Sequence, residues 1–280
     1  MRWFTFVFLF LLFMGVVKSD AQTADSIESK YDTSFQKLIK LHGQVKGLYK
    51  ALENLQPIAI AENSNFYIFE PCGNSSYKFV KKTPWDFPVP RGIRAAMPLQ
   101  GYGFKSVCVI SGDAFDKLED CIIIFHEFVH CLQFQTVEFK LKDKLVINKE
   151  EMSKGNFMWE LNYKFPYEDE KFEKSYTEFL NALGKSDEKG IASARENLKN
   201  ILSFREYEYM TWQEWKEGYA RYIENKLRKF LDVKINDYGK EKPYNRISFY
   251  AGGSGYIDYL VNSKIVNADE LEEIYNKIMK

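Results

Sequence analysis

The chain has 280 residues, enough for one large domain or two lobes. Hydrophobic residues make up 45% and charged residues 28%, as is usual for a globular protein with a buried core. Lys plus Arg and Asp plus Glu both number 39, so the formal net charge is zero. This balance gives no electrostatic indication of binding to nucleic acid or to an anionic membrane.

The first 21 residues have the features of a secretory signal peptide. Arg2 provides a positive charge, residues 4–17 are almost wholly apolar, and residues 19–21 place small side chains where a signal peptidase reads them. The apolar run is shorter than the roughly 20 residues that span a bilayer. We therefore expect cleavage before Gln22 and a secreted protein, extracellular or periplasmic, with no stable membrane anchor. An uncleaved anchor is the alternative.

Hydrophobic spacing predicts a helix followed by a sheet in the first part of the mature chain. Apolar residues three and four apart predict an amphipathic helix over residues 32–55, which Pro57 ends. Short apolar or alternating runs predict strands at residues 66–69, 77–80 and 106–110.

The rest of the chain is expected to be mostly helical. A segment that is apolar on most sides predicts a buried helix over about residues 117–136, and the Lys-rich stretch of about 138–156 is interpreted as a connector. Thr211 begins an S/T-x-x-E pattern, so a helix is expected to start at Trp212. The helices expected after the connector cover about residues 172–183, 190–208, 212–230 and 267–279.

Export permits disulfides, and four cysteines follow the signal: Cys72, Cys108, Cys121 and Cys131. If Cys121 and Cys131 share one helix, they lie roughly 15 Å apart, beyond the limit of about 7 Å for a disulfide. A Cys108–Cys121 bond and a Cys72–Cys108 bond are the two alternatives that remain.

His126, Glu127 and His130 form the pattern His-Glu-x-x-His. The two histidines are one helical turn apart, so both imidazoles can bind one ion at about 2.0–2.1 Å, the usual Zn–N distance. Glu127 lies beside them and can act as a general base toward water at the metal. The alternative is a pair of ordinary surface histidines, but the flanking Ile and Phe residues favour a buried helix whose polar face needs partners.

A catalytic zinc ion has three protein ligands and one open position. The chain has only three histidines, and none follows His130. His42 lies in the predicted N-terminal helix, where we expect a structural role. The third ligand is therefore expected to be a carboxylate from another part of the chain.

Two segments together resemble a known family. Residues 126–133 fit H-E-x-x-H-x-x-Q and residues 215–222 fit W-x-E-G-x-A-x-Y, the pattern of the peptidase-MA-like branch of the gluzincins. The resemblance covers about residues 105–260. It implies an α+β, thermolysin-like zincin with a small N-terminal sheet and the active-site helix over a mostly helical C-terminal lobe. It also implies that Glu217 is the third zinc ligand, with Gly218 allowing close approach of the motif helix.

Two features depart from the family pattern. Glu217 follows His130 by 87 residues, a longer gap than expected, whereas Glu160 lies only 30 residues after His130 and is the competing candidate. Thermolysin-type enzymes also carry an Asp four residues after the ligand Glu, where this chain has Arg221. The carboxylate that would support a ligand histidine is therefore not identified.

Residues 246–256 resemble the Tyr-containing, Gly-rich turn and helix that follow the ligand helix in such peptidases. By this resemblance, Tyr250 or Arg246 is expected to stabilise the oxyanion of the tetrahedral intermediate. The alternative is a loop that simply needs glycines at positive φ.

The sequence thus predicts a secreted metallopeptidase that binds one Zn²⁺ ion through His126, His130 and Glu217 and uses Glu127 as general base. A peptide or protein is the expected partner, and no nucleic acid is expected. The predicted divisions are a signal peptide at 1–21, an α+β lobe with the motif helix at 22–137, and a helical lobe at 138–280. A catalytically inactive binding protein and a zinc hydrolase acting on a non-peptide bond are the alternatives.

Overall fold

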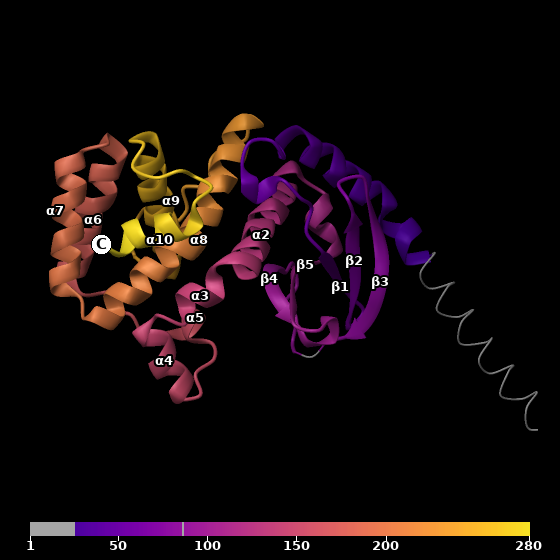
Figure 1. Cartoon of the computed structure of the whole chain (residues 1–280), viewed down its shortest axis with the longest axis horizontal. Coiled ribbons are helices and arrows are strands. Elements are labelled where there is room, and N and C mark those ends of the chain that lie inside the picture. Colours follow the sequence, from indigo (N-terminus) through magenta and orange to yellow (C-terminus); the bar gives the residue numbers. More distant parts are fainter. Residues whose placement is uncertain (1–25, 86) are drawn as a thin grey trace, which may run out of the picture. The chain divides into compact units, whose positions relative to one another are not determined.

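The chain forms two compact units in a computed structural model, which describes residues 26–85 and 87–280 (Figure 1). Of the described residues, the sheet unit contains 26–46, 54–85 and 87–117, and the helical unit contains Gly47–Glu53 and Leu118–Lys280. The predicted signal peptide at residues 1–21 lies outside the described residues. Among the described residues, none of the helices is both long and apolar enough to cross a bilayer.

The sheet unit contains one five-stranded sheet with the order β3-β2-β1-β5-β4. Strands β1 and β5 are parallel, and the other neighbours are antiparallel. The bounds are β1 Ile58–Glu62, β2 Asn65–Cys72, β3 Ser76–Pro84, β4 Arg94–Leu99 and β5 Lys105–Ile110. The three predicted strands correspond to β2, β3 and β5 and are confirmed. Strands β1 and β4 are rich in Ala, and β4 contains Pro98, which an edge strand tolerates.

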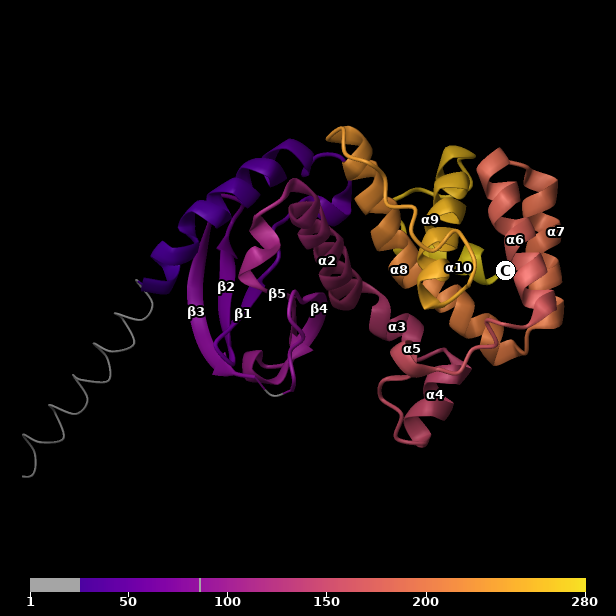
Figure 2. The same ribbon diagram turned by 180° about the vertical axis from the view of Figure 1, so that it is seen from behind.

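Residues 26–45 form a helix that lies along one face of this sheet in both views (Figures 1 and 2). The ring of Phe35 lies 4.8 Å from that of Phe69 and 4.6 Å from that of Tyr77. The predicted helix was expected to continue to residue 55. Instead the chain turns near Gly47 and forms a short 3-10 helix, η1 (Lys50–Leu52), because glycine weakens a continuous helix.

The helical unit is built around α8, which packs against α2, α9 and α10. The expected boundary at residue 137 placed the motif helix with the sheet, whereas the contacts of α2 group it with the helical unit. The Lys-rich connector is itself partly helical. The bounds are α2 Leu118–Thr136, α3 Glu138–Lys142, α4 Val146–Ser153, α5 Trp159–Asn162, α6 Glu170–Lys185, α7 Glu188–Ile201, α8 Phe204–Phe230, α9 Arg246–Asn262 and α10 Leu271–Met279.

Helix α8 begins earlier than expected. The side chain of Ser203 accepts a hydrogen bond from the backbone N–H of Glu206, and the Glu206 carboxylate accepts one from the backbone N–H of Ser203. The capping box predicted at Thr211 is therefore wrong: Thr211 lies inside the helix, where its hydroxyl donates to the carbonyl of Tyr207 at 2.8 Å. The same S/T-x-x-E pattern occurs at both positions, and the earlier one starts the helix.

Helices α8 and α9 approach closely at two glycines. A Cβ atom on Gly253 would lie 2.1 Å from the carbonyl oxygen of Glu214, and one on Gly218 would lie 2.7 Å from the Cα of Gly253. Gly218 therefore allows the approach of α9, and not of the motif helix as expected. Residues 246–256 are helical and Gly253 does not have a positive φ, so the alternative of a loop with glycines at positive φ is wrong. Glycine is needed at this position because the two backbones pack closely.

Replacing Gly253 by Ala is expected to lower the free energy of unfolding by about 3 kcal/mol, because the added methyl group overlaps the backbone of α8. Urea unfolding measures the effect. The control is Gly184→Ala in α6, where a Cβ meets open space and up to about 1 kcal/mol of stabilisation is expected. Equal stability of Gly253→Ala and the parent protein would contradict this packing.

The four cysteines are thiols in the structure. Cys121 and Cys131 both lie in α2, which confirms the assumption used to exclude a disulfide between them. Neither of the two disulfides left open by the sequence, Cys108–Cys121 and Cys72–Cys108, is formed.

Candidate metal centre

Helix α2 is mostly apolar and buried around three polar side chains: His126, Glu127 and His130. Its apolar residues in this region are inaccessible to solvent: Ile122, Ile124, Phe125, Phe128 and Val129. His126 and Glu127 are each 7% exposed and His130 is 8% exposed. Polar groups buried to this degree need partners that replace water, and the neighbouring helices supply them.

The imidazoles of His126 and His130 converge with a carboxylate from α8. The two Nε2 atoms lie 3.2 Å apart, and Glu217 Oε2 lies 3.4 Å from His130 Nε2. Ligand atoms of these three residues all lie within 4.8 Å of one another. Donor atoms about 2.0–2.1 Å from a tetrahedral zinc lie about 3.3 Å from one another. Two imidazoles and one carboxylate at this spacing can therefore hold a metal ion.

The outer nitrogen of His126 is held by a carboxylate that the sequence analysis did not identify. His126 Nδ1 lies 3.0 Å from Glu224 Oε2. A carboxylate accepts the Nδ1 proton, which leaves the Nε2 lone pair directed at the metal position. Glu224 follows Glu217 by seven residues, two turns along α8, so both carboxylates lie on one face of the helix. The seven-residue spacing of Glu217 and Glu224 is the feature of the sequence that points to Glu224.

Glu224 is itself fixed by several donors. Its Oε1 accepts hydrogen bonds from Arg228 Nε at 2.8 Å and Asn236 Nδ2 at 3.0 Å, while Arg221 Nε lies 3.2 Å from its Oε2. Burial raises the pKa of Glu224, but the hydrogen bond with His126, its charge and the charge of Arg221 lower that pKa to about 2. Glu224 therefore stays ionised. Arg221, which stands where thermolysin-type enzymes have an Asp, contacts this carboxylate.

The outer nitrogen of His130 is held by Gln133 from the same helix. His130 Nδ1 lies 2.8 Å from Gln133 Oε1, and Gln133 Nε2 donates to the backbone carbonyl of Lys216 at 3.1 Å. The second bond fixes the orientation of the amide, so its oxygen accepts the proton of His130 Nδ1. Gln133 thereby orients His130 and connects α2 to α8 next to Glu217.

The electrostatics at His130 and Glu217 favour positive charge. Burial lowers the pKa of His130, but the charge of Glu217, a hydrogen bond with it and the charge of Glu127 raise that pKa to about 9. Burial raises the pKa of Glu217, but the charges of His130 and His126 hold it far below its ordinary value. One carboxylate and two imidazoles thus converge on a point that suits a cation, and the charge of Glu127 adds to the negative potential there.

The structure does not bring Glu160 to the histidines. Its carboxylate is paired with Lys142, accepts from Trp212 Nε1 at 3.0 Å and lies 2.8 Å from Lys216 Nζ. Burial raises the pKa of Glu160, but the charges of Lys216 and Lys142 lower it to about 2. Lys216 also pairs with Glu138 at 2.8 Å. Glu160 therefore belongs to a charge network that connects α3, α5 and α8.

Tyr250 and Arg246 lie on the first two turns of α9. Arg246 donates a hydrogen bond to the Tyr250 hydroxyl, and the guanidinium groups of Arg246 and Arg221 lie 5.3 and 5.7 Å from the Tyr250 ring. Burial, the charge of Glu217 and a hydrogen bond with Glu217 raise the pKa of Tyr250. The structure thus brings Tyr250 to the candidate ligand Glu217, and Arg246 contacts Tyr250.

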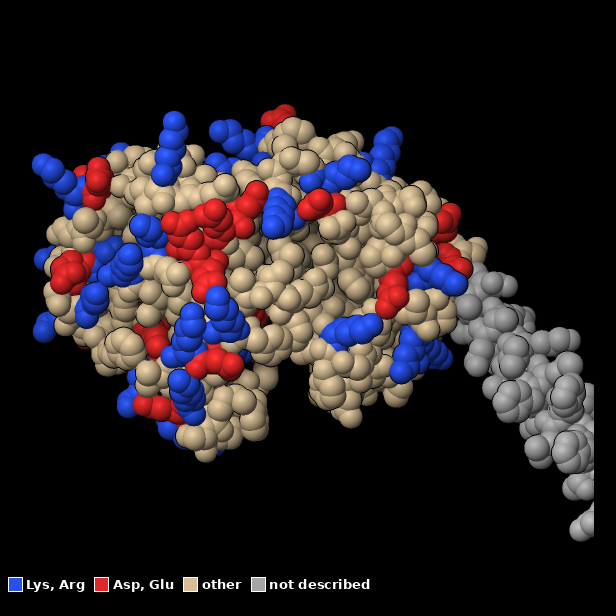
Figure 3. All heavy atoms as spheres, in the orientation of Figure 1, with Lys and Arg blue, Asp and Glu red and all other residues tan. Residues whose placement is uncertain are grey.

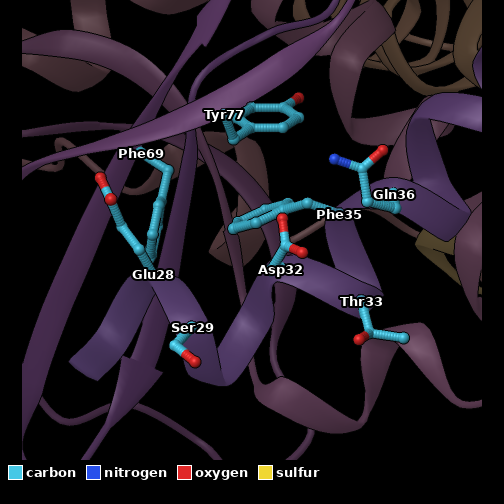
Figure 4. Close-up of a pocket in the computed structure, with 8 residues that line it drawn as sticks. All are labelled: Glu28, Ser29, Asp32, Thr33, Phe35, Gln36, Phe69 and Tyr77. Atoms are coloured by element: carbon cyan, nitrogen blue, oxygen red, sulfur yellow. The ribbon is translucent and has the colours of Figure 1, made fainter. Parts of the chain in front are cut away.

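The sheet unit contains an open pocket of ≈ 500 Å³ between the helix of residues 26–45 and strands β2 and β3 (Figure 4). Its carboxylates are Glu28 and Asp32, and no His or Cys lines it. Glu28 accepts a hydrogen bond from the backbone N–H of Phe79 at 2.7 Å, which attaches the helix to β3. His42, on this helix, is buried in the same unit. The pocket contains none of the metal-centre residues.

The site is therefore of the two-imidazole, one-carboxylate class, built on α2 and α8. Comparison with known protein families, curated proteins and solved structures finds no match for this chain.

Glu224→Gln is expected to weaken Zn²⁺ binding by roughly 10–100-fold, because the neutral amide holds His126 less strongly than the carboxylate. Competition with a chromogenic chelator measures the affinity. Glu178→Gln, an exposed position on α6, is the matched control and should leave the affinity unchanged. Equal affinity of the Glu224→Gln and Glu178→Gln variants would remove Glu224 from the site.

Proposed function

We propose that the chain is a secreted zinc metallopeptidase of the thermolysin-like, gluzincin type. The observation that carries the proposal is the convergence of His126 Nε2, His130 Nε2 and Glu217 on one point, next to Glu127 on the same buried helix turn. The W-x-E-G-x-A-x-Y pattern around Glu217 supports the gluzincin assignment. Export is part of the proposal and depends on the N-terminal sequence.

The donor set favours zinc over magnesium or calcium. Those two ions prefer all-oxygen ligands, whereas two neutral imidazoles and a carboxylate suit a tetrahedral zinc ion with one position left for water or substrate. Zinc bound at such a site polarises a carbonyl group and lowers the pKa of water toward about 7. Glu224 and Gln133 support this choice, because they hold both imidazoles with Nε2 facing inward.

Glu127 acts as the general base in this proposal. It is next to His126 on α2, its charge contributes to the raised pKa of His130, and it is not one of the three converging ligands. It takes a proton from the attacking water and delivers that proton to the leaving amine. The low exposure of Glu127 limits competing exchange with bulk water.

Tyr250 donates its hydroxyl proton toward the oxyanion that develops on the substrate carbonyl. The raised pKa of Tyr250 keeps the phenol protonated and able to donate. Arg246 donates to the phenol oxygen, which orients the hydroxyl and increases its strength as a donor. Arg246 is therefore proposed to assist the oxyanion through Tyr250.

Incubation of a diverse peptide mixture with the purified protein tests this function. We expect cleavage that a zinc chelator abolishes and added Zn²⁺ restores. Cleavage that persists in the chelator would contradict the proposal. Zinc binding without turnover of any peptide would favour the inactive binding protein, and turnover of esters alone would favour a non-peptide hydrolase.

A further inference from the structure

Helices α3–α5 and the turn that precedes α5 carry a group of exposed apolar side chains. Their exposed fractions run from 37% at Val146 to 71% at Phe157. We call the group the α3–α5 surface; it consists of Phe139, Val146, Met152, Phe157, Met158 and Leu161. Single exposed apolar residues are normal in soluble proteins, but six large ones within one short stretch indicate a surface that binds something.

These side chains are presented by an ordered substructure with its own core. Leu141, Leu145, Ile147 and Trp159 are buried beneath the surface. Trp159 Nε1 donates to Asn148 Oδ1 at 3.0 Å, and Lys142 pairs with Glu160, so the three helices are joined to one another. The exposed residues therefore do not result from a frayed segment, since a core already exists without them.

Helix α4 shows the arrangement most clearly. Ile147 faces inward, while Val146, Lys149 and Met152 follow one another at intervals of three and are exposed. Residues three apart lie on one side of a helix. The outer side of α4 therefore alternates apolar and basic side chains.

The outward charge of this segment is mainly positive. Among residues 138–164 the exposed charged residues are Lys140, Lys144, Lys149, Lys154 and Lys164 against Asp143. The four glutamates are buried or half-buried and are paired with Lys or Arg: Glu138, Glu150, Glu151 and Glu160. Lys140 and Lys144 share Glu272 of α10. Lys154 pairs with Glu151, so Lys149 and Lys164 are the exposed lysines of this segment for which no ion pair with a described residue is seen. Exposed lysines nevertheless outnumber exposed acidic residues here, although the whole chain has zero net charge.

Figure 3 shows the lower left projection, which Figure 1 identifies as α3–α5. Basic side chains lie along it with acidic ones between them, and its lower end is uncharged. Large apolar side chains flanked by lysines are typical of proteins that lie at a membrane interface: the apolar groups enter the acyl boundary and the lysines face anionic headgroups.

We propose that the α3–α5 surface docks the protein onto an anionic lipid surface. The apolar residues supply insertion and the lysines supply electrostatic attraction. The interaction is peripheral and reversible, because the side chains involved reach only the interface. Lipid binding by this surface does not depend on the metal centre, so the vesicle experiments test it independently of the peptidase proposal.

Sedimentation with vesicles tests the proposal, using phosphatidylcholine alone and phosphatidylcholine mixed with phosphatidylglycerol. We expect binding to the anionic vesicles that weakens with added salt, and much weaker binding to the neutral ones. The double variant Phe157→Ser, Met158→Ser should bind at least about tenfold less. Its matched control is Phe230→Ser, an exposed phenylalanine at the end of α8, which should bind like the parent protein.

The basic component is tested with Lys149→Gln and Lys164→Gln combined. Loss of two lysines near an anionic surface is expected to reduce binding roughly thirtyfold. Lys185→Gln with Lys229→Gln, two exposed positions elsewhere, should change it less than about twofold. Circular dichroism shows that each variant is folded.

Absence of binding to anionic vesicles would overturn the proposal, and so would unchanged binding by the Phe157→Ser, Met158→Ser variant. If vesicles are not bound but this variant cleaves a protein substrate with a raised KM, the surface binds protein and not lipid.

Discussion

Glu127→Gln is expected to keep its zinc and to lose hydrolysis by a factor of about 10²–10⁴, the usual effect of removing a general base. The amide has the size of the carboxylate but cannot take a proton from water. Glu127 is not one of the three converging ligands, so metal content should stay at that of the parent protein. Peptide turnover and zinc content, measured on the same sample, give both quantities.

Glu119→Gln is the matched control for this substitution. Glu119 lies in the first turn of the same helix and is exposed, so its variant should retain both zinc and activity. Loss of zinc in Glu127→Gln would show that Glu127 is a ligand, and full activity would show that another group is the base.

Glu217→Ala is expected to lower zinc affinity more than about 100-fold, beyond the loss caused by removing a residue that only supports a ligand. Glu217 supplies the one carboxylate among the converging atoms. Glu160→Ala should keep its zinc, because Glu160 pairs with Lys142 and Lys216 instead. Equilibrium dialysis of the two variants side by side measures the difference.

The Glu160→Ala variant should instead lose stability, by about 3 kcal/mol, because the Lys216 side chain is only 18% exposed and loses one of its two carboxylate partners. Urea unfolding reports this change. Zinc retained in Glu217→Ala and lost in Glu160→Ala would exchange the two assignments.

Helix α2 could be predicted because its signals are local. The apolar run predicted a buried helix, and histidines four apart in such a helix lie on one face whatever surrounds them. The resemblance also pointed to Glu217, which the structure places beside His130 although 87 residues separate them in the chain. In both cases the motif that identifies the ligand consists of residues next to that ligand in the sequence.

The role of Glu224 was not predicted, because the seven-residue spacing from Glu217 alone does not show which helix lies opposite. Glu224 reads as one charged residue among many on α8 until α8 lies against α2 and brings it to His126. Strands β1 and β4 carry residues of low strand propensity, and pairing within the sheet outweighs that preference. The S/T-x-x-E pattern occurs twice in α8, and only the buried contacts after Ser203 distinguish the two.

The central claim is that one zinc ion is held by His126, His130 and Glu217. Anomalous diffraction at the zinc absorption edge, from crystals of the protein grown with Zn²⁺, tests it most directly. We predict a single strong peak at about 2.0–2.2 Å from an imidazole Nε2 of each histidine and from a carboxylate oxygen of Glu217. A peak bound by other residues, or no peak between these three in zinc-loaded protein, would contradict the account.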